Sequence, residues 1–168
     1  MLEAARDVTA WGTAAEGGRT LSGSRLETHR RDVLARLSVM SLVEPGQPME
    51  THATAHVEAG AVARAWLDLI HSGRSASSWA VTAPAFKEAI APEEWQAALR
   101  SVRAALGRCR SRRLQSQSAF KAFPGLPPGP YAVNRFESGF EGRDGVIETV
   151  ATCLGADGLW RATAYFVG

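Results

Sequence analysis

The chain of 168 residues has no long apolar run and only two cysteines. A transmembrane helix needs about 18 consecutive apolar residues, so the sequence predicts no membrane span. Cys109 and Cys153 are too few for a disulfide framework or a cysteine-based metal site. We expect both to be free thiols, on strands separated by a third strand, which fits a reducing compartment.

Strong net charge is also missing, because 19 basic side chains nearly balance 17 acidic ones and leave +2 at pH 7. So small a charge gives no reason to expect nucleic acid or an anionic membrane as a partner. The Walker, Gly-x-Ser-x-Gly and His-Glu-x-x-His motifs are absent, and no cofactor is expected. His52 and His56 have the i, i+4 spacing of helical metal ligands, but no third ligand lies nearby, so no metal is expected.

The N-terminal segment is poor in large apolar side chains. Residues 1–23 are polar and rich in Gly, Ser and Ala, which is typical of disorder. Ser24 and Glu27 have capping-box spacing, so residues 24–43 can form a helix. We therefore expect 1–50 to be a disordered extension carrying that helix, and 54–168 to be a single domain.

A clean signal peptide is missing as well, because charged residues such as Glu3, Arg6 and Asp7 interrupt the N-terminus. The sequence leaves the localisation open. The cytoplasm is the default expectation, and the periplasm is the alternative if the true start is Met40 or Met49.

Helical periodicity predicts three helices between residues 56 and 106. The first spans about 56–71, the second is short and has Pro84 in its first turn, and the third spans 92–106. Gly107 stands where a C-cap glycine belongs. Residues 75–79 are expected to form a polar corner between the first two.

After Gly107 the periodicity changes to two, which is typical of strands. Asp144-Gly145 and Asp157-Gly158 separate alternating runs, a strong signal for hairpin turns. The expected strands span residues 108–120, 131–138, 146–154 and 159–167. Helices followed by strands favour an α+β fold, with three helices packed on one face of a curved four-stranded antiparallel meander.

Aromatic residues and glycines recur at fixed spacings through the helices and strands. They are Trp66-Leu67-x-Leu69, Gly73, Ser78-Trp79, Phe86, Trp95, Leu99, Arg103, Leu106-Gly107, Arg113, Pro124-Gly125-x-Pro127-x-Gly129-x-Tyr131, Phe136, Phe140, Glu148-Thr149-Val150 and Asp157-Gly158-x-Trp160-Arg161-x-x-x-Tyr165. This set resembles bacterial domain-of-unknown-function family 4019 over about residues 58–167. That family is usually described as similar to the cone-shaped, cystatin-like fold of nuclear transport factor 2 and ketosteroid isomerase, and it has no assigned activity. One departure from the family pattern is Ala164, where the family usually has a glycine before its C-terminal Tyr.

The resemblance implies a cavity between the helices and the concave sheet face, the default place for a ligand. Its aromatic side chains either line that cavity or simply fill the core. Trp160 and Tyr165 are an odd number of residues apart, so only one faces the cavity unless a bulge intervenes. The candidate ligand-binding residues are Trp66, Trp79, Phe86, Arg113, Tyr131, Trp160 and Tyr165.

Three titratable residues are weak candidates for acid–base chemistry: Asp68, His71 and Glu148. Asp68 and His71 are one helical turn apart and could act as orienting carboxylate and base. The competing interpretation, which we favour, is a solvated pair. For Glu148 we favour a cross-strand ion pair with Arg161.

Arginines cluster around the end of the third helix, at Arg100, Arg103, Arg108, Arg110, Arg112 and Arg113. They either bind an anionic ligand or nucleic-acid backbone, or protect a solvated edge strand from aggregation, which we favour. Arg113 belongs to the family pattern, so we expect it to have a specific partner, either Glu148 or a backbone carbonyl.

The sequence as a whole favours a non-enzymatic module that binds a small apolar ligand or another protein. An open sheet also leaves an apolar outer face, so we expect a homodimer. The alternative is an isomerase- or hydrolase-like enzyme that uses a base in the cone.

Overall fold

The computed structural model describes residues 51–122 and 126–168, with four helices followed by four strands. The α+β class is confirmed, and the predicted extension over 1–50 with its helix over 24–43 lies outside the described residues. The elements are α2 (Thr51–His71), α3 (Ser75–Ala80), α4 (Pro84–Ala89), α5 (Pro92–Leu106), β1 (Cys109–Phe120), β2 (Tyr131–Phe140), β3 (Val146–Leu154) and β4 (Trp160–Val167).

The helices differ from the prediction in two places. Helix α2 begins at Thr51, earlier than predicted, and residues 75–79 belong to helix α3, so the predicted polar corner was wrong. The reason is tertiary: Ser78 is fully buried, and its hydroxyl donates to the Ser75 carbonyl at 2.8 Å and accepts the indole N–H of Trp95 at 3.0 Å. A segment that local propensity assigns to a turn is thereby held as a helical turn.

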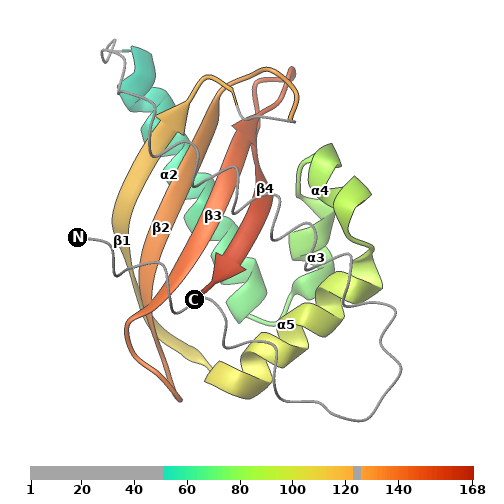
Figure 1. Ribbon diagram of the computed structural model, residues 1–168, viewed down its shortest axis with the longest axis vertical. Helices are drawn as coiled ribbons and strands as arrows, with labels where there is room; N and C mark the ends of the chain where they lie inside the picture. Colours follow the sequence, from blue (N-terminus) through green and yellow to red (C-terminus); the bar gives the residue numbers. More distant parts are fainter. Residues whose placement is uncertain (1–50, 123–125) are drawn as a thin grey trace, which may run out of the picture.

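The sheet is the predicted antiparallel meander. Its strands lie in the order β1-β2-β3-β4, and β1 and β4 form its edges (Figure 1). Gly145 and Gly158 take φ of 68° and 75° in the turns that connect β2 to β3 and β3 to β4. These turns require positive φ, which glycine adopts without a steric penalty.

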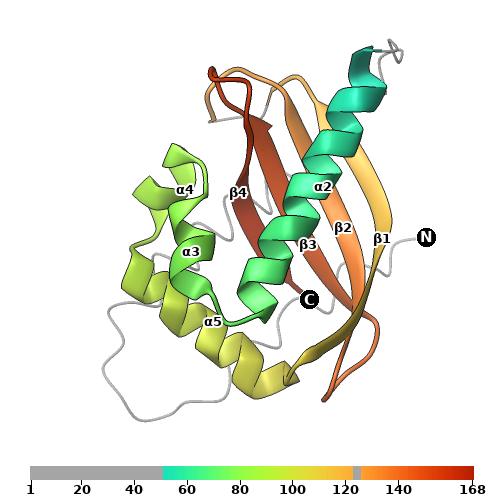
Figure 2. The same cartoon turned by 180° about the vertical axis from the view of Figure 1, so that it is seen from behind.

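The helices form one layer on one face of the sheet. Helix α2 crosses all four strands, and α3, α4 and α5 continue the layer beyond β4 (Figure 2). None of the described helices is both long and apolar enough to cross a membrane.

The space between the two layers is filled by aromatic side chains. Trp66 stacks on Trp95 with 5.6 Å between ring centroids, and both meet Tyr165 edge to face at 5.5 and 5.9 Å. Phe86 closes the cluster against Trp66 at 6.1 Å. Both indole N–H groups donate to Ser78, one to its carbonyl and one to its hydroxyl. The aromatic residues here pack against one another as a core.

Strand β4 contains a bulge that decides which residues face the helices. Ala164 pairs with Ala151 and Ala162 pairs with Thr152, which leaves Thr163 as the extra residue. Ala162 and Tyr165 therefore both join the helix-facing core despite their odd spacing. Trp160 is two residues before Ala162 and so points to the same face of the sheet. Trp160 and Tyr165 therefore both face the helices, because the bulge lies between them.

Both cysteines are free, as predicted. Cys109 opens β1 and Cys153 lies in β3, with β2 between them. A disulfide between these positions is excluded by the intervening strand.

Gly107 ends α5 in a conformation that only glycine adopts readily, with φ 76° and ψ −152°. A Cβ there would also lie 2.9 Å from the Cβ of Glu141. We expect Gly107→Ala to lower the free energy of unfolding by about 1–3 kcal/mol. Gly145→Ala is the control, because it has a similar φ but open space around the Cβ. Urea denaturation should show the smaller loss for Gly145→Ala, and equal losses would contradict the predicted collision.

Candidate functional site

A fully buried carboxylate lies at the centre of the candidate site. Glu148 belongs to β3 and is 0% exposed. It occupies the helix-facing side of the strand together with Val146 and Val150, so a charged side chain interrupts an apolar alternation. Burying a carboxylate is costly unless charges and hydrogen bonds compensate, so its partners define the site.

Four side chains from four other elements donate to this carboxylate. His71 Nε2 of α2 and the Tyr165 hydroxyl of β4 contact Oε1 at 2.8 and 2.7 Å. The Ser138 hydroxyl of β2 and Arg112 Nε of β1 contact Oε2, the latter at 3.4 Å. Within the described residues, no buried side-chain nitrogen or oxygen lacks a hydrogen-bond partner.

Arg112 connects the buried carboxylate to the surface. Its side chain is 7% exposed, and Nη1 forms an ion pair with Asp68 Oδ1 at 2.8 Å, whose side chain is 65% exposed. Its guanidinium therefore balances the charge of Glu148 inside the protein and that of Asp68 at the surface. A planar guanidinium suits such bridging because its donors point in fixed directions.

These contacts shift the pKa values of the site. Burial alone raises the pKa of Glu148, but the hydrogen bond and charge of His71, with the hydroxyls of Ser138 and Tyr165, overcome it and lower the pKa to about 2. Burial and then the neighbouring carboxylate raise the pKa of Tyr165 well above its usual range. At neutral pH an ionised Glu148 thus accepts from a neutral Tyr165.

The lowered pKa of Glu148 predicts an acid-sensitive fold. Its pKa falls from 4.5 to about 2 on folding, so the group stabilises the folded state above pH 4.5 and that stabilisation is lost as the pH falls through 2. The shift corresponds to about 3 kcal/mol. Urea denaturation measures the difference in free energy of unfolding between wild type and Glu148→Gln. We expect this difference to be much smaller at pH 2.5 than at pH 7. An unchanged difference would contradict the shift.

A pocket of about 120 Å³ adjoins this cluster, between the end of α2, α5 and the start of β1. His71 and Cys109 lie in its lining, next to the buried carboxylate. Its apolar walls come from Ile70, Leu99, Val102 and Phe140.

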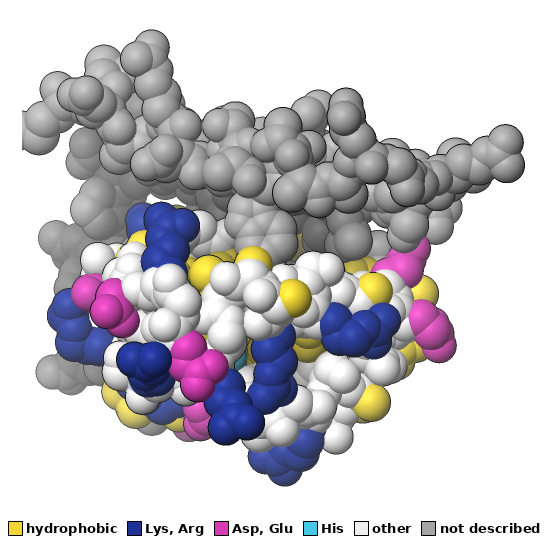
Figure 3. Space-filling model, turned by 90° about the horizontal axis from the view of Figure 1, so that it is seen from below, with side chains coloured by type: hydrophobic (Ala, Val, Ile, Leu, Met, Phe, Trp, Pro, Cys, Tyr) yellow, Lys and Arg dark blue, Asp and Glu magenta, His cyan; other side chains and the backbone are white. Residues whose placement is uncertain are grey.

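Three arginines also line the pocket: Arg100, Arg103 and Arg108. All three are exposed, and none of the described acidic side chains forms an ion pair with their guanidinium groups. Figure 3 looks onto the end of the molecule where α5 passes into β1, and basic side chains gather there. The pocket therefore brings these three arginines together at one place, as the anionic-ligand interpretation of the arginine cluster requires.

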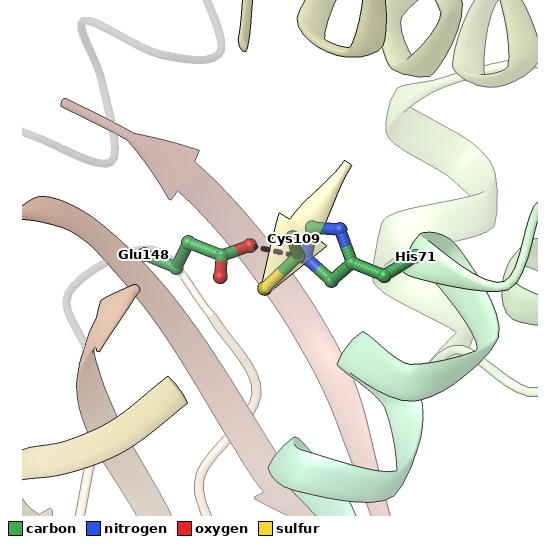
Figure 4. A group of neighbouring side chains, drawn as sticks. All are labelled: His71, Cys109 and Glu148. Carbon is green, nitrogen blue, oxygen red and sulfur yellow. Dashed lines mark hydrogen bonds and ion pairs between the residues drawn. The ribbon is translucent and has the colours of Figure 1, made fainter. Parts of the chain in front are cut away.

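The pocket side of the cluster holds two groups capable of chemistry. Figure 4 shows the His71 ring meeting Glu148 through one nitrogen while the other points away from it. Cys109 Sγ lies within 4.8 Å of the His71 and Glu148 ligand atoms. Burial raises the pKa of the Cys109 thiol despite the nearby Arg112, so it is a poor nucleophile at neutral pH. The arrangement can support proton transfer at His71, or metal binding by all three residues.

The three weak catalytic candidates are linked to one another, because Arg112 pairs with both Asp68 and Glu148, and Glu148 also binds His71. Asp68 is exposed to solvent, as predicted. The prediction was wrong for His71, because its Nε2 binds the buried Glu148. The predicted Glu148–Arg161 pair is also wrong. Arg161 binds Asp157 in the adjoining turn, because its side chain points to the face opposite that of Glu148.

None of the seven predicted ligand-binding residues lines this pocket. Trp66, Phe86 and Tyr165 belong to the aromatic core, and Trp79 is half-buried against Lys87. Tyr131 packs on the outer sheet face, Trp160 is half-buried in β4, and Arg113 pairs with Glu137 at the surface. Their roles in binding stay predictions.

Arg112 takes the role expected of Arg113 because of a bulge at the start of β1. Cys109 pairs with Phe140 and Arg112 with Ser138, so residues three apart share the helix-facing side. In a regular strand Cys109 and Arg113 would share it. Arg112, Ser138 and Cys109 were not predicted to lie beside Glu148, and no residue pattern in β1 signals this bulge. The charged Glu148 within an apolar strand was the one available signal.

One family model matches the chain, over residues 62–165, and its description is Protein of unknown function (DUF4019). The chain belongs to this family. No curated protein and no solved structure shows significant similarity to it. Membership of DUF4019 agrees with the resemblance noted in the sequence and assigns no activity.

Proposed function

We propose that this DUF4019 chain is a small-ligand-binding domain whose pocket takes a small organic anion. The observation that carries the proposal is the apolar pocket bordered by Arg100, Arg103 and Arg108 beside the Glu148 cluster. The sequence favoured an apolar ligand. The three arginines at the pocket indicate that this ligand also carries an anionic group.

The size of the pocket limits the ligand. A volume of about 120 Å³ is below the range of drug-sized sites and close to that of an engineered cavity of about 150 Å³ that binds benzene. Butyrate has as many non-hydrogen atoms as benzene and combines an apolar tail with a carboxylate. It is therefore a suitable probe.

Electrostatics favour an anion over a neutral ligand. The carboxylate of Glu148 is already matched by His71 and Arg112, so it does not cancel the charge of the arginines at the pocket. An anion placed between those guanidinium groups gains charge-assisted hydrogen bonds. Because the arginines are exposed, each contributes modestly and the attraction weakens with salt.

Isothermal titration of the full chain with butyrate tests this proposal. We expect binding to one site, and at least a tenfold loss of affinity in the triple variant Arg100→Gln, Arg103→Gln, Arg108→Gln. The matched control is Arg110→Gln, Arg113→Gln, Arg143→Gln, which removes the same charge from exposed arginines outside the pocket lining. No binding of butyrate, or equal loss in both variants, would refute the anion pocket.

A second candidate is catalysis, favoured by the ring nitrogen of His71 that points away from Glu148 (Figure 4). Glu148 would orient the imidazole while that nitrogen removes a proton next to a carbonyl group. The test is exchange of the methyl protons of pyruvate in D₂O, followed by NMR. Catalysis predicts exchange above the buffer rate that His71→Gln abolishes, and exchange at the buffer rate would exclude this reaction.

Two further proposals concern the fold and the assembly of the chain. The helix layer on one face of a curved meander supports the cone-shaped, cystatin-like fold of nuclear transport factor 2 and ketosteroid isomerase, which an experimental structure would test. The proposed homodimer has weaker support, because the apolar residues of the outer face, Tyr131, Val133, Ala151 and Ala164, are already buried. Light scattering of the full chain at high concentration tests it, and a strict monomer would refute it.

A further inference from the structure

Three side chains beside the pocket offer donor atoms of the kinds that bind transition metals. His71 contributes Nε2, Cys109 contributes Sγ and Glu148 contributes a carboxylate oxygen, and these atoms all lie within 4.8 Å of one another. They come from α2, β1 and β3 and converge on one point (Figure 4). Ligand atoms around a tetrahedral Zn²⁺ lie about 3.3–3.7 Å apart, so small side-chain movements are enough to form a site.

The donor set selects the metal. One nitrogen, one sulfur and one carboxylate oxygen suit Zn²⁺ or Co²⁺ better than the hard ions Mg²⁺ and Ca²⁺, which prefer oxygen alone. Zinc sites that act on ligands have three protein donors and one open position. Here His71 and Cys109 both line the pocket, so the fourth position opens into it.

The surroundings already orient the carboxylate for this role. Oε1 accepts from His71 and Tyr165, while Oε2 is held by Ser138 and Arg112, so a metal on Oε1 replaces the direct contact with His71 and leaves the contacts of Oε2 intact. Arg112 Nη2 lies 3.8 Å from Cys109 Sγ and stabilises a thiolate there. Such outer contacts fix the geometry of metal ligands.

The charges balance when the metal is bound. The two positive charges of the ion are neutralised by the carboxylate of Glu148 and the thiolate of Cys109. The positive charge of Arg112 is neutralised by Asp68. The thiol proton leaves to solvent when the metal–sulfur bond forms. His71 binds the metal as a neutral imidazole through Nε2 and keeps one proton on Nδ1, and if both ring nitrogens carry a proton beforehand, the one on Nε2 also leaves to solvent. No electron is transferred.

We propose that His71, Cys109 and Glu148 form a binding site for a zinc-like divalent cation. This inference goes beyond the anion pocket and does not rest on it.

Cobalt titration of the full, untagged, chelator-treated chain tests the site, because Co²⁺ bound to a thiolate gives a charge-transfer absorption in the near ultraviolet. We expect one equivalent of Co²⁺ to produce this band and Zn²⁺ to displace it. Cys109→Ser should abolish the band, and Cys153→Ser, the matched control on β3, should keep it. His71→Gln should weaken binding at least tenfold and His56→Gln should not.

Two outcomes would overturn the site: no charge-transfer band in the wild type, or a band that depends on Cys153 instead of Cys109. Circular dichroism of each variant confirms that the fold is retained, and the Cys109→Ser change is small enough to preserve it. The triple arginine variant separates the two proposals. It should lose butyrate binding and keep the cobalt band.

Discussion

Replacing Glu148 with Gln should lower the free energy of unfolding by about 3–5 kcal/mol. The substitution keeps the size of the side chain but removes the charge that Arg112 and His71 face inside the protein. An amide also places a donor where four donors already converge on the carboxylate. Urea denaturation followed by circular dichroism measures the loss, and the melting temperature should fall by more than about 10 °C.

The matched control is Glu137→Gln on β2. Glu137 also pairs with an arginine, Arg113, but at the surface, where its side chain is 39% exposed. Solvent screens such pairs, so we expect a loss of less than about 1 kcal/mol. If Glu148→Gln costs no more than this control, the buried cluster does not hold the strands and α2 together as described.

Replacing Trp66 with Ala should cost about 3–5 kcal/mol as well. Trp66 is 3% exposed and contacts Phe86, Trp95 and Tyr165. The substitution leaves a large cavity and removes three ring contacts, each worth about 0.5–1.5 kcal/mol beyond the buried area. It also leaves the Ser78 carbonyl without the indole donor. Circular dichroism is the suitable probe, because the change removes a fluorophore.

Trp160→Ala provides the comparison, since Trp160 is only half-buried on the edge strand β4. Its loss should stay below about 2 kcal/mol. This pair also separates the two interpretations of the aromatic residues. If they lined an open cavity, Trp66→Ala would cost little, and similar losses in the two variants would contradict a packed core.

The sequence predicted the sheet better than the site. Alternation and the turns at Gly145 and Gly158 are local, so the four strands and their order followed from neighbouring residues. Helix α3 could not be predicted from neighbouring residues, because it depends on Ser78 being buried between Trp66 and Trp95. Local propensity favours a turn there, and packing overrides it.

The partners of Glu148 could not be predicted for a similar reason. Which arginine faces inward depends on the bulge that puts Cys109 and Arg112 on one side of β1. His71 reaches the carboxylate only because α2 crosses the sheet. Strand register and the crossing of a helix over a sheet depend on several elements, so the residue types of one element do not predict them. The sequence therefore indicated a charged residue in an apolar strand but did not predict which side chains surround it.

The most direct test of the anion pocket is ¹⁵N–¹H NMR of the full chain during titration with butyrate. Binding between α2, α5 and β1 predicts saturable shifts of the backbone amides around Arg103, Gly107 and Cys109, with small changes on the outer face of the sheet. Shifts confined to other elements, or none up to high butyrate concentration, would contradict the central claim that this pocket binds a small organic anion.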